Sequence, residues 1–333
     1  MTFATGVGSV PGSDERDFTE AVRTVLGVLE EQLPFLPEMP GRGPAASMTG
    51  RSLAVVADLA ADLQPDGWRL TGPGATSGVD HRRARSLLAQ DLDTLEEQAQ
   101  GLTGPFKVQV AGPWTLAATV EKPRGDKVLA DHGARRDLAQ ALAEGVRQHV
   151  AAVRRRLPGL TELVVQVDEP VLAAVAAGQV PTASGYGRHR RVDRPELSES
   201  LGWVLGAATG AGARAWVHSC AAQVDWPLVV GAGAEGLVLD TGLLTAGDLD
   251  TVAESLEAGR TVVLGSLPAS GGATPPGAGR LVEQTLRLLE SLGLDPDQVG
   301  EHLGLTTSCG TAGATAGWSR SVLETAAAAA RDL

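Results

Sequence analysis

The residues best suited to chemistry in this 333-residue chain are two cysteines and one histidine. Cys220 lies two positions after His218 in WVHSCA, and Cys309 lies 89 residues further along the chain in TTSCGTAG. Imidazole nitrogen and thiolate sulfur are the ligands that zinc prefers, so these three residues are candidate metal ligands. For each cysteine taken alone, a buried thiol acting as a small hydrophobic residue is the simpler interpretation. Only a fold that brings the three side chains together favours a metal site.

A fourth ligand is expected from Asp240, which ends the run GLVLD and offers a carboxylate oxygen. Its alternative role is to cap a following helix. Three nitrogen and sulfur ligands plus one exchangeable position are typical of a catalytic zinc site. Zinc removes the proton from a bound thiol, whose pKa is otherwise about 8.5, and leaves a nucleophilic sulfur in place. The ligand set therefore indicates thiol alkylation rather than hydrolysis.

Two further segments carry groups suited to an amino acid substrate. In QVDEP, the carboxylate of Asp168 can accept hydrogen bonds from an ammonium group, although helix capping by Asp168 or Glu169 explains the motif equally well. In VGSVPG, the turn of Val7, Gly8 and Ser9 offers backbone N–H groups to a carboxylate. Together with a metal-bound sulfur, these groups predict an amino thiol substrate such as homocysteine.

Short apolar runs alternate with amphipathic stretches along the chain, which is the pattern of an α/β protein. Eight strands are predicted, over Phe3–Val7, Gly67–Thr71, Phe106–Val110, Glu162–Val167, Arg214–Val217, Gly236–Leu239, Thr261–Leu264 and Leu303–Thr306. Helices are predicted over Glu15–Leu33, Thr49–Leu63, Arg82–Gln100, Ala134–Leu157, Pro195–Thr209, Val224–Val230, Leu249–Ala258, Ala278–Leu292 and Trp318–Arg331. The count favours a (β/α)8 TIM barrel over a doubly wound open sheet. We expect one domain over residues 1–333, with extended loops over the C-terminal face at 34–48, 72–80, 118–133 and 177–194.

A TIM barrel explains why residues far apart in sequence form one site. The carboxyl ends of its strands converge on a single mouth, whatever their separation along the chain. Asp168, His218, Cys220, Asp240 and Cys309 all follow predicted strand ends, whereas the strand bodies are apolar. Both cysteines of the chain fall in this set. This coincidence favours a shared metal site over independent structural roles.

Composition disfavours several other classes of function. The chain has 28 Lys and Arg against 40 Asp and Glu, a net charge of −12, which repels nucleic acid and anionic membranes. No apolar run approaches the roughly 20 residues of a membrane span, and no secretory signal is visible. Two cysteines do not make a disulfide framework, so a cytoplasmic location is expected. The dense basic segment 185–194 (GYGRHRRVDR) is interpreted as a solvated loop, with a lid over an acidic donor as the alternative.

The ordered motifs resemble the catalytic, C-terminal domain of cobalamin-independent methionine synthase, in the uroporphyrinogen-decarboxylase/methionine-synthase-like barrel superfamily. The matching segments cover nearly the whole chain and are VGSVPG, VAGPWTLA, PRGD, QVDEP, VHSCA, GLVLD and SCG. The resemblance implies a zinc-dependent methyltransferase that makes methionine from homocysteine, with His218, Cys220 and Cys309 as zinc ligands. It places Asp240 where the family has a glutamate ligand. It also implies that Asp168 holds the amino group of homocysteine and that the turn after the first strand holds its carboxylate.

The chain departs from that family on the side that binds the methyl donor. We expect no counterpart here of the second barrel of the full-length enzyme, which helps to bind polyglutamylated folate, because 333 residues are too few for both. Thr119 replaces the folate-stacking tryptophan, Ala174 a folate-contacting glutamate and Ser266 the proton-donating histidine. The glutamate that joins in amine binding is missing after the second predicted strand, and Glu38 in the first loop is a candidate substitute. We therefore expect a donor such as a methyl-corrinoid or a corrinoid protein, which needs no proton on its leaving group.

Three alternative functions stay open. The superfamily includes methyl-corrinoid:coenzyme M thiol methyltransferases, which have a similar His-x-Cys and distant Cys. Porphyrinogen decarboxylases have a comparable Gly-Pro turn, but they need no paired cysteines and bind acidic tetrapyrroles through arginines, in which these strand ends are poor. A non-catalytic zinc- or corrinoid-binding protein would share the metal ligands without needing Asp168. Trp114, in the Gly-Pro turn, is explained equally well by substrate contact and by core packing.

Overall fold

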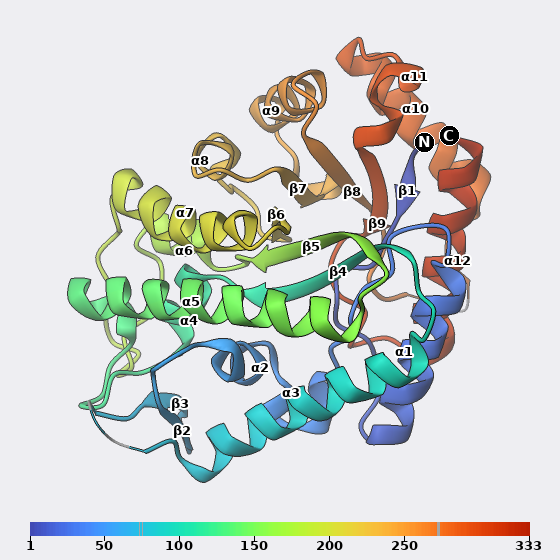
Figure 1. Cartoon of the computed structure of the whole chain (residues 1–333). Coiled ribbons are helices and arrows are strands. Elements are labelled where there is room, and N and C mark those ends of the chain that lie inside the picture. Colours follow the sequence, from blue (N-terminus) through green and yellow to red (C-terminus); the bar gives the residue numbers. More distant parts are fainter. Residues whose placement is uncertain (73, 75, 272–273) are drawn as a thin grey trace.

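The computed structural model describes residues 1–72, 74, 76–271 and 274–333, and its centre is a curled parallel β-sheet (Figure 1). The sheet has seven strands in the order β1-β9-β8-β7-β6-β5-β4. Their bounds are β1 Phe3–Ala4, β4 Gly104–Ala111, β5 Leu160–Asp168, β6 Arg214–Ser219, β7 Gly236–Asp240, β8 Thr261–Leu267 and β9 Leu303–Thr307. All six pairings between neighbours are parallel. The predicted α/β class, with a curled parallel sheet of the barrel type, is confirmed.

The segment 33–38 fills the position between the two edge strands, β1 and β4. The Leu33 N–H donates to the Ala4 carbonyl at 3.0 Å, and the Leu36 N–H donates to the Lys107 carbonyl at 2.9 Å. Two prolines in the segment lack an N–H and prevent a regular ladder. The segment nevertheless bonds to both edges of the sheet and occupies the eighth strand position of the barrel.

The predicted second barrel strand, Gly67–Thr71, is therefore wrong. These residues form β3 (Gly67–Leu70), which pairs antiparallel with β2 (Ala61–Gln64) in a separate hairpin. The helix predicted over Thr49–Leu63 ends early, as α2 (Met48–Val55), because the rest of that segment leads into β2. A short alternating run has the same pattern in a hairpin as in a barrel strand, so the sequence did not separate the two.

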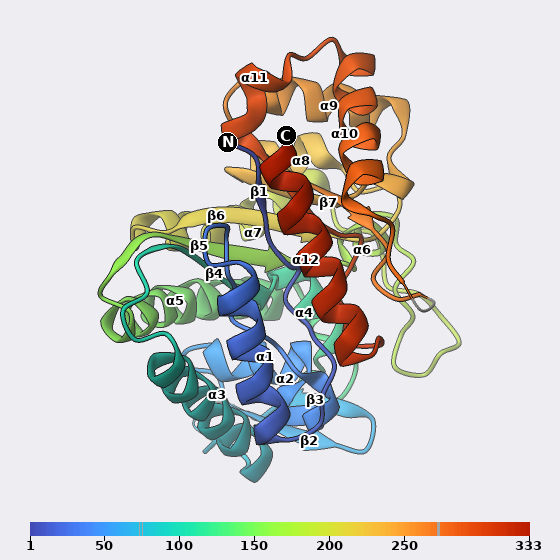
Figure 2. The ribbon, with the colours of Figure 1, turned by 90° about the vertical axis from the view of Figure 1, so that its right-hand side faces the viewer.

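Helices cover the outside of the sheet and lie close to their predicted positions. The longer ones are α1 Glu15–Val28, α3 Val79–Gln98, α5 His132–Arg156, α7 Arg194–Gly210, α9 Ala246–Glu257, α10 Ala278–Leu292 and α12 Ala316–Asp332; shorter ones are α4 Pro113–Thr119, α6 Leu172–Ala176, α8 Trp226–Gly231 and α11 Pro296–Val299. Helices α1 and α12 pack side by side, and the two chain ends lie near each other (Figure 2). Among the described residues, no helix has the length and apolar character to cross a membrane. Residues 73 and 75 of the loop predicted at 72–80 lie outside the described residues.

Along β5, β6, β7 and β8, side chains alternate between two apolar clusters. One set packs between the sheet and the helices. The other set forms a separate buried cluster inside the barrel, made of Leu33, Val164, Trp216, Val238 and Val263. Because a strand repeats every two residues, Gln166 and His218 follow two of these apolar residues on the inner face. The alternation therefore directs polar side chains into the barrel near its carboxyl-end mouth.

Candidate metal and substrate site

The three residues predicted as metal ligands meet at the ends of β6 and β9. The ligand atoms of His218, Cys220 and Cys309 all lie within 4.8 Å of one another. The two sulfurs are 2.7 Å apart. Two thiolates at about 2.3 Å from one tetrahedral zinc ion lie roughly 3.8 Å apart, so a shift of about 1 Å would admit such an ion. The nitrogen and sulfur donors present are those that zinc prefers, and their spacing suits a shared cation.

The ring of His218 is oriented by a hydrogen bond on one side. Its Nδ1 lies 3.0 Å from the carbonyl oxygen of Val238 on the neighbouring strand, and the residue is 3% exposed. A carbonyl can only accept, so Nδ1 carries the hydrogen and donates it. The lone pair then lies on Nε2, which is the tautomer that a metal-ligating histidine requires.

The two sulfurs share one proton. The Cys220 thiol donates a hydrogen bond to Cys309, and this bond, together with the nearby imidazole of His218, holds the pKa of the Cys309 thiol well below its ordinary value. The pKa of Cys220 is raised, first by its hydrogen bond to Cys309 and then by burial. These opposite shifts in pKa belong to the pair, which favours one thiolate beside one thiol. A cation between the sulfurs would ionise the second thiol as well.

Asp240 lies outside this cluster, and its role as a metal ligand stays a prediction. Its side chain accepts a hydrogen bond from the Gly242 N–H at 2.8 Å and caps the short 3-10 helix Thr241–Leu243. Among the described residues, the group able to hold one ion consists of the histidine and the two cysteines. The alternative role as a helix cap is the one observed, because the backbone of its own turn engages the carboxylate.

Asp168 lies at the same mouth as the cysteines. It ends β5 directly beside His218 in the strand register, and it is 7% exposed. The Nε2 of Gln166 donates to Asp168 Oδ1 and to the carbonyl of Val7, each at 2.7 Å. Burial raises the pKa of Asp168, while His218, the bond from Gln166 and Lys107 lower it. The carboxylate is therefore held in place beside the sulfur cluster and beside the first turn.

The turn at Val7–Ser9 fits closely between its neighbours because of two glycines. Gly8 has a φ of +149°, and a Cβ there would lie 2.8 Å from the side chain of Gln109. A Cβ on Gly310, in the loop after β9, would overlap the hydroxyl of Ser9. The predicted carboxylate-binding turn thus packs directly against the loop that carries the second cysteine.

Glu38 ends the segment that occupies the eighth strand position, so it lies at a strand end rather than in a free loop. It is 7% exposed and lies 3.4 Å from Arg51. Burial raises the pKa of Glu38 to about 7, and the charge of Asp168 adds to this rise. The charges of Arg51 and Lys107 and a hydrogen bond with Gln109 act in the opposite direction. The structure therefore places this candidate substitute carboxylate at the mouth, electrostatically coupled to Asp168.

Sequence reasoning missed a charged network behind Glu38. Asp91, on α3, is 1% exposed and accepts two hydrogen bonds from Arg42, at 2.7 and 2.8 Å. It also pairs with Arg51, which links the network to Glu38. The signal in the sequence was an aspartate on the same stripe as the buried leucines of that helix, such as Leu88.

Lys107 was missed as well. It lies inside the barrel on β4 and is fully buried. Its Nζ donates to the carbonyl of Val7 at 3.0 Å and to Gln109 Oε1 at 3.2 Å. Burial lowers its pKa to about 8, against the charges of Asp168 and Glu38, which raise it. A lysine within the apolar run FKVQV was the available signal, because a buried strand seldom contains an unpaired charge.

Glu169, in the QVDEP motif, links that motif to VAGPWTLA. Its carboxylate accepts hydrogen bonds from the backbone N–H of Trp114 at 2.9 Å and of Thr115 at 2.8 Å, at the start of α4. A Cβ on Gly112 would overlap this side chain. Burial raises the pKa of Glu169 to about 7, against the lowering effect of these hydrogen bonds. The capping interpretation holds for Glu169, but the capped helix precedes the motif instead of following it.

Trp114 lies in the core. It is 1% exposed, and its indole N–H donates to the carbonyl of Leu197 at 2.9 Å. An indole that is enclosed and already hydrogen-bonded has no face to offer to a substrate. Of the two interpretations of Trp114, core packing is the one that its surroundings support.

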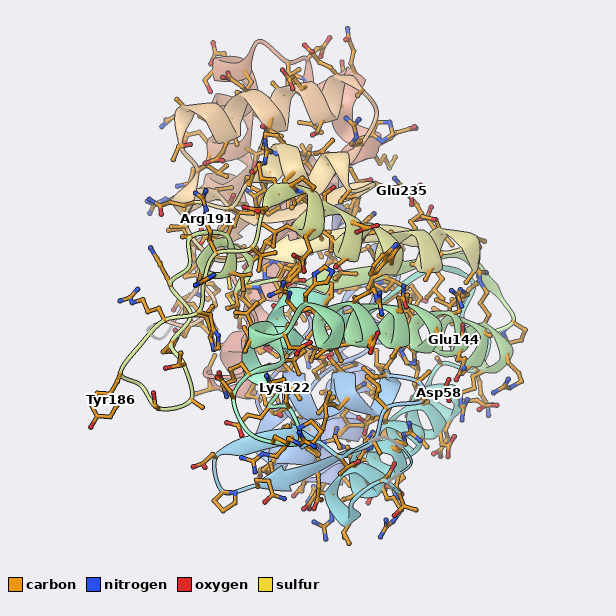
Figure 3. The ribbon with its side chains drawn as sticks, turned by 90° about the vertical axis from the view of Figure 1, so that its left-hand side faces the viewer. Asp58, Lys122, Glu144, Tyr186, Arg191 and Glu235 are labelled. Atoms are coloured by element: carbon orange, nitrogen blue, oxygen red, sulfur yellow. The ribbon has the colours of Figure 1, made fainter. Side chains whose placement is uncertain are left out.

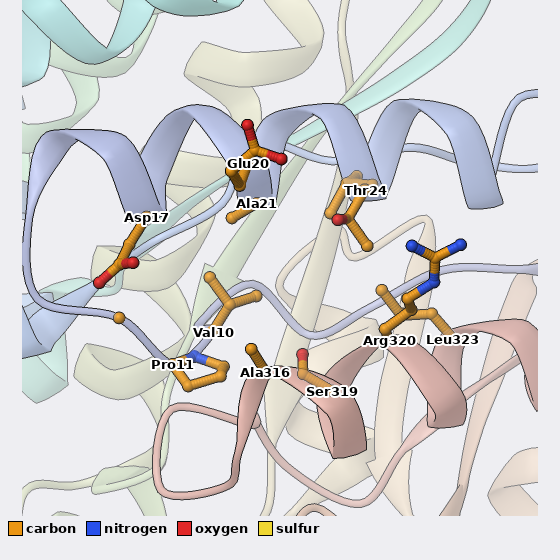
Figure 4. A pocket seen from close by; sticks show the side chains of 12 residues that line it. Val10, Pro11, Asp17, Glu20, Ala21, Thr24, Ala316, Ser319, Arg320 and Leu323 are labelled. Carbon is orange, nitrogen blue, oxygen red and sulfur yellow. The ribbon is translucent and has the colours of Figure 1, made fainter.

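Two other surface features lie apart from the cluster. A groove of about 310 Å³ runs between α1 and α12, lined by residues that include Asp17, Glu20 and Arg320 (Figure 4). None of the predicted metal ligands lines it. The basic segment 185–194 belongs to a protruding loop with Tyr186 fully exposed near its tip (Figure 3). Neither feature supplies a group to the candidate site.

Comparisons with known proteins support the fold. No protein-family profile and no curated protein matches this chain. The chain is similar to the structure of a B12-independent methionine synthase from Shewanella sp. W3-18-1 in complex with selenomethionine, with a TM-score of 0.60 and 14% identity over 99% of this chain and 96% of that one. It is less similar to a GH5_18 protein from Streptomyces cattleya (TM-score 0.42, 18% identity, 92% and 71% covered) and to 2,3-dimethylmalate lyase (TM-score 0.37, 12% identity, 99% and 78% covered). At such low identity, the first likeness establishes the barrel fold and nothing finer.

Proposed function

We propose that this protein is an enzyme, a zinc-dependent methyltransferase that methylates the thiol of homocysteine to give methionine. The observation that carries the proposal is the meeting of His218, Cys220 and Cys309 at the mouth that also holds Asp168. A zinc ion held by these three side chains would act as a Lewis acid that lowers the pKa of a substrate thiol. The likeness in fold to a methionine synthase bound to selenomethionine supports the same substrate class.

The remaining residues of the mouth suit the amino acid end of homocysteine. Asp168 and Glu38 would accept hydrogen bonds from its ammonium group, and the backbone N–H groups of Gly8 and Ser9 would bind its carboxylate. Holding both groups fixes the position of the sulfur before reaction. In the transfer, the substrate sulfur attacks the methyl carbon; the S–C bond forms as the bond to the donor breaks, and that electron pair leaves with the donor. The chain's own contribution is therefore orientation and charge.

We propose that the methyl donor is not polyglutamyl folate and that a methyl-corrinoid or a corrinoid protein is the better candidate. Thr119, Ala174 and Ser266 stand where the resembled family has its folate-side residues. Ser266 bonds to the hydroxyl of Thr241 at 3.2 Å. A serine hydroxyl is not an acid able to protonate a leaving nitrogen at neutral pH, whereas a corrinoid leaving group requires no proton.

The charges at the mouth favour homocysteine over the alternative substrates. A coenzyme M-type thiol carries a sulfonate and no amine, so Asp168 and Glu38 would repel it. An acidic porphyrinogen needs free cations, but Arg51 and Lys107 are buried and already paired. A non-catalytic metal-binding protein has no need of either carboxylate. Two thiols that must stay reduced also suit a cytoplasmic setting.

The proposal is tested by methyl transfer in vitro. Zinc-loaded protein is incubated with homocysteine and either methylcobalamin or methyl-tetrahydrofolate, and methionine is measured by mass spectrometry. We expect methionine from methylcobalamin. Faster formation from the folate would reverse the choice of donor. Absence of product from both donors with zinc-loaded protein, or a protein that cannot be loaded with zinc, would overturn the function itself.

A further inference from the structure

Lys107 is a buried cation with no part in metal binding, and it contacts several elements of the candidate site. It is fully buried, and its ammonium lies 5.3 Å from the ring centroid of Phe35. Burying an ammonium group is costly unless nearby groups compensate for the lost hydration. A barrel built only for stability would place an apolar residue here. The groups that compensate the buried charge of Lys107 therefore indicate the role of this residue.

The hydrogen bonds and opposite charges that compensate Lys107 come from groups proposed to hold the substrate or from residues bonded to them. Lys107 donates to the carbonyl of Val7, which begins the carboxylate-binding turn. It also donates to Gln109, and Gln109 in turn donates to the carbonyl of Leu36, two residues before Glu38. The carboxylates of Glu38 and Asp168 are near enough that each interacts electrostatically with Lys107. One ammonium group thus bonds to the first turn, lies over Phe35 of the segment 33–38 and interacts electrostatically with Asp168 at the end of β5.

The carbonyl of Val7 is the point where this arrangement converges. It accepts hydrogen bonds from Lys107 at 3.0 Å and from Gln166 at 2.7 Å. Gln166 also donates to Asp168. Two donors on one carbonyl fix the plane of the peptide that leads into Gly8, and with it the direction of the Gly8 N–H. The orientation of the turn and that of the Asp168 carboxylate are therefore set together.

We propose that Lys107 is a positioning residue that holds the Val7–Ser9 turn and the two carboxylates, Glu38 and Asp168, in the arrangement that receives the amino acid end of the substrate. This inference rests on the proposed function for the identity of the substrate. Lys107 does not touch the substrate, and it lies outside the His218–Cys220–Cys309 cluster. Its effect is accordingly on recognition of the ammonium and carboxylate groups, and not on metal binding or on the reacting sulfur.

The test compares Lys107→Met, which removes charge and donors, with Lys107→Gln, which keeps a donor. Lys127→Met is the matched control, because Lys127 pairs with Glu121 at 3.6 Å and donates to the carbonyl of Thr119 at 3.4 Å, and neither residue is proposed to hold homocysteine. Binding of homocysteine and of propane-1-thiol to zinc-loaded protein is measured by calorimetry, together with zinc content. We expect Lys107→Met to weaken homocysteine binding at least tenfold, Lys107→Gln to have an intermediate effect and Lys127→Met to have none. Propane-1-thiol, which lacks both polar groups, should bind all four proteins within twofold.

Equal weakening of both thiols would show a general structural role and would overturn the inference. Unchanged homocysteine binding would overturn it too. If Lys107→Met does not fold, the charge-balanced variant Lys107→Met/Glu38→Gln replaces it, with the single variant Glu38→Gln as reference.

Hydrogen exchange provides a readout that needs neither zinc nor substrate. We expect the amides of residues 7–12 to exchange at least tenfold faster in Lys107→Met, with residues 215–222 unchanged. If wild-type protein binds no zinc, the proposed function fails. The exchange experiment still decides whether Lys107 holds the turn, and an unchanged rate at residues 7–12 contradicts that role.

Discussion

The mouth of the barrel has two sides that are built differently. The sulfur side consists of His218, Cys220 and Cys309, whose cysteines are partly exposed and bond chiefly to each other. The charged side is buried and joined by hydrogen bonds and ion pairs. It consists of Glu38, Lys107 and Asp168 with their partners Arg51, Gln109 and Gln166. Buried charges are stable only when paired and hydrogen-bonded, whereas a metal ion supplies the cohesion of its own ligands. The charged side therefore depends on its network, and the sulfur side depends on a cation.

The largest expected effect is on the sulfur side. Cys220→Ser removes one thiolate ligand, so we expect zinc content to fall from about one ion per chain to below about 0.1, with loss of methyl transfer. Plasma emission spectroscopy of purified protein measures the metal. Asp240→Asn is the matched control, and it should keep its zinc because Asp240 only caps its own turn. Equal metal loss in both variants would return Asp240 to the ligand set.

The next effect is on the charged side, and it should leave the metal in place. Asp168→Asn removes a charged acceptor for the ammonium group, which costs about 1.5–3 kcal/mol, or roughly 10- to 150-fold in homocysteine affinity. Calorimetry with homocysteine measures the loss, and zinc content should equal that of wild type. A variant that binds homocysteine normally would instead support a metal-binding protein without amine recognition.

Glu38 gives the charged side a pH dependence of its own. Its folded-state pKa of about 7 lies above the ordinary 4.5, so the unfolded chain loses this proton first as the pH rises. The free energy of unfolding should therefore fall by up to about 3 kcal/mol between pH 4.5 and 7. Over the same range kcat/KM for homocysteine should rise, because the carboxylate that accepts the ammonium group forms.

The variant Glu38→Gln checks both consequences. In this variant, the difference in the free energy of unfolding between pH 5 and pH 7.5, measured with urea, should be smaller than in wild type. The pH profile of kcat/KM should lose its rise near pH 7. Arg51, Lys107 and Asp168 are the charged groups that face Glu38, and they are unchanged in this variant. Profiles that coincide with those of wild type would mean that Glu38 takes no part in recognition.

The smallest effect is expected outside both sides, at Trp114. Trp114→Phe keeps most of the packing and loses the hydrogen bond to Leu197, which costs about 0.5–1.5 kcal/mol of stability. The KM for homocysteine should stay within twofold of wild type. A tenfold rise in KM, with little loss of stability, would restore Trp114 to the substrate site.

The sequence predicted one side of the mouth much better than the other. The His-x-Cys spacing and the only two cysteines of the chain were enough to single out the sulfur side. The charged side was only partly predicted, because Lys107 and Asp91 lie inside apolar patterns where residue type alone reveals no partner. Glu38 was found as a candidate, but its strand position was not. Prolines in the segment 33–38 hid a barrel strand, while an alternating run at Gly67–Leu70 imitated one.

The sequence by itself determined the α/β alternation, the apolar strand bodies and the polar strand ends, because these follow from two-residue and 3.6-residue periodicity. Only the tertiary structure decided which strand ends face one another. Strands β6 and β9 are separated by two others, so in a flat sheet their ends would lie roughly 14 Å apart. Curling of the sheet brings the sulfurs of Cys220 and Cys309 to 2.7 Å. That closure depends on every strand pairing at once, and no local pattern encodes it.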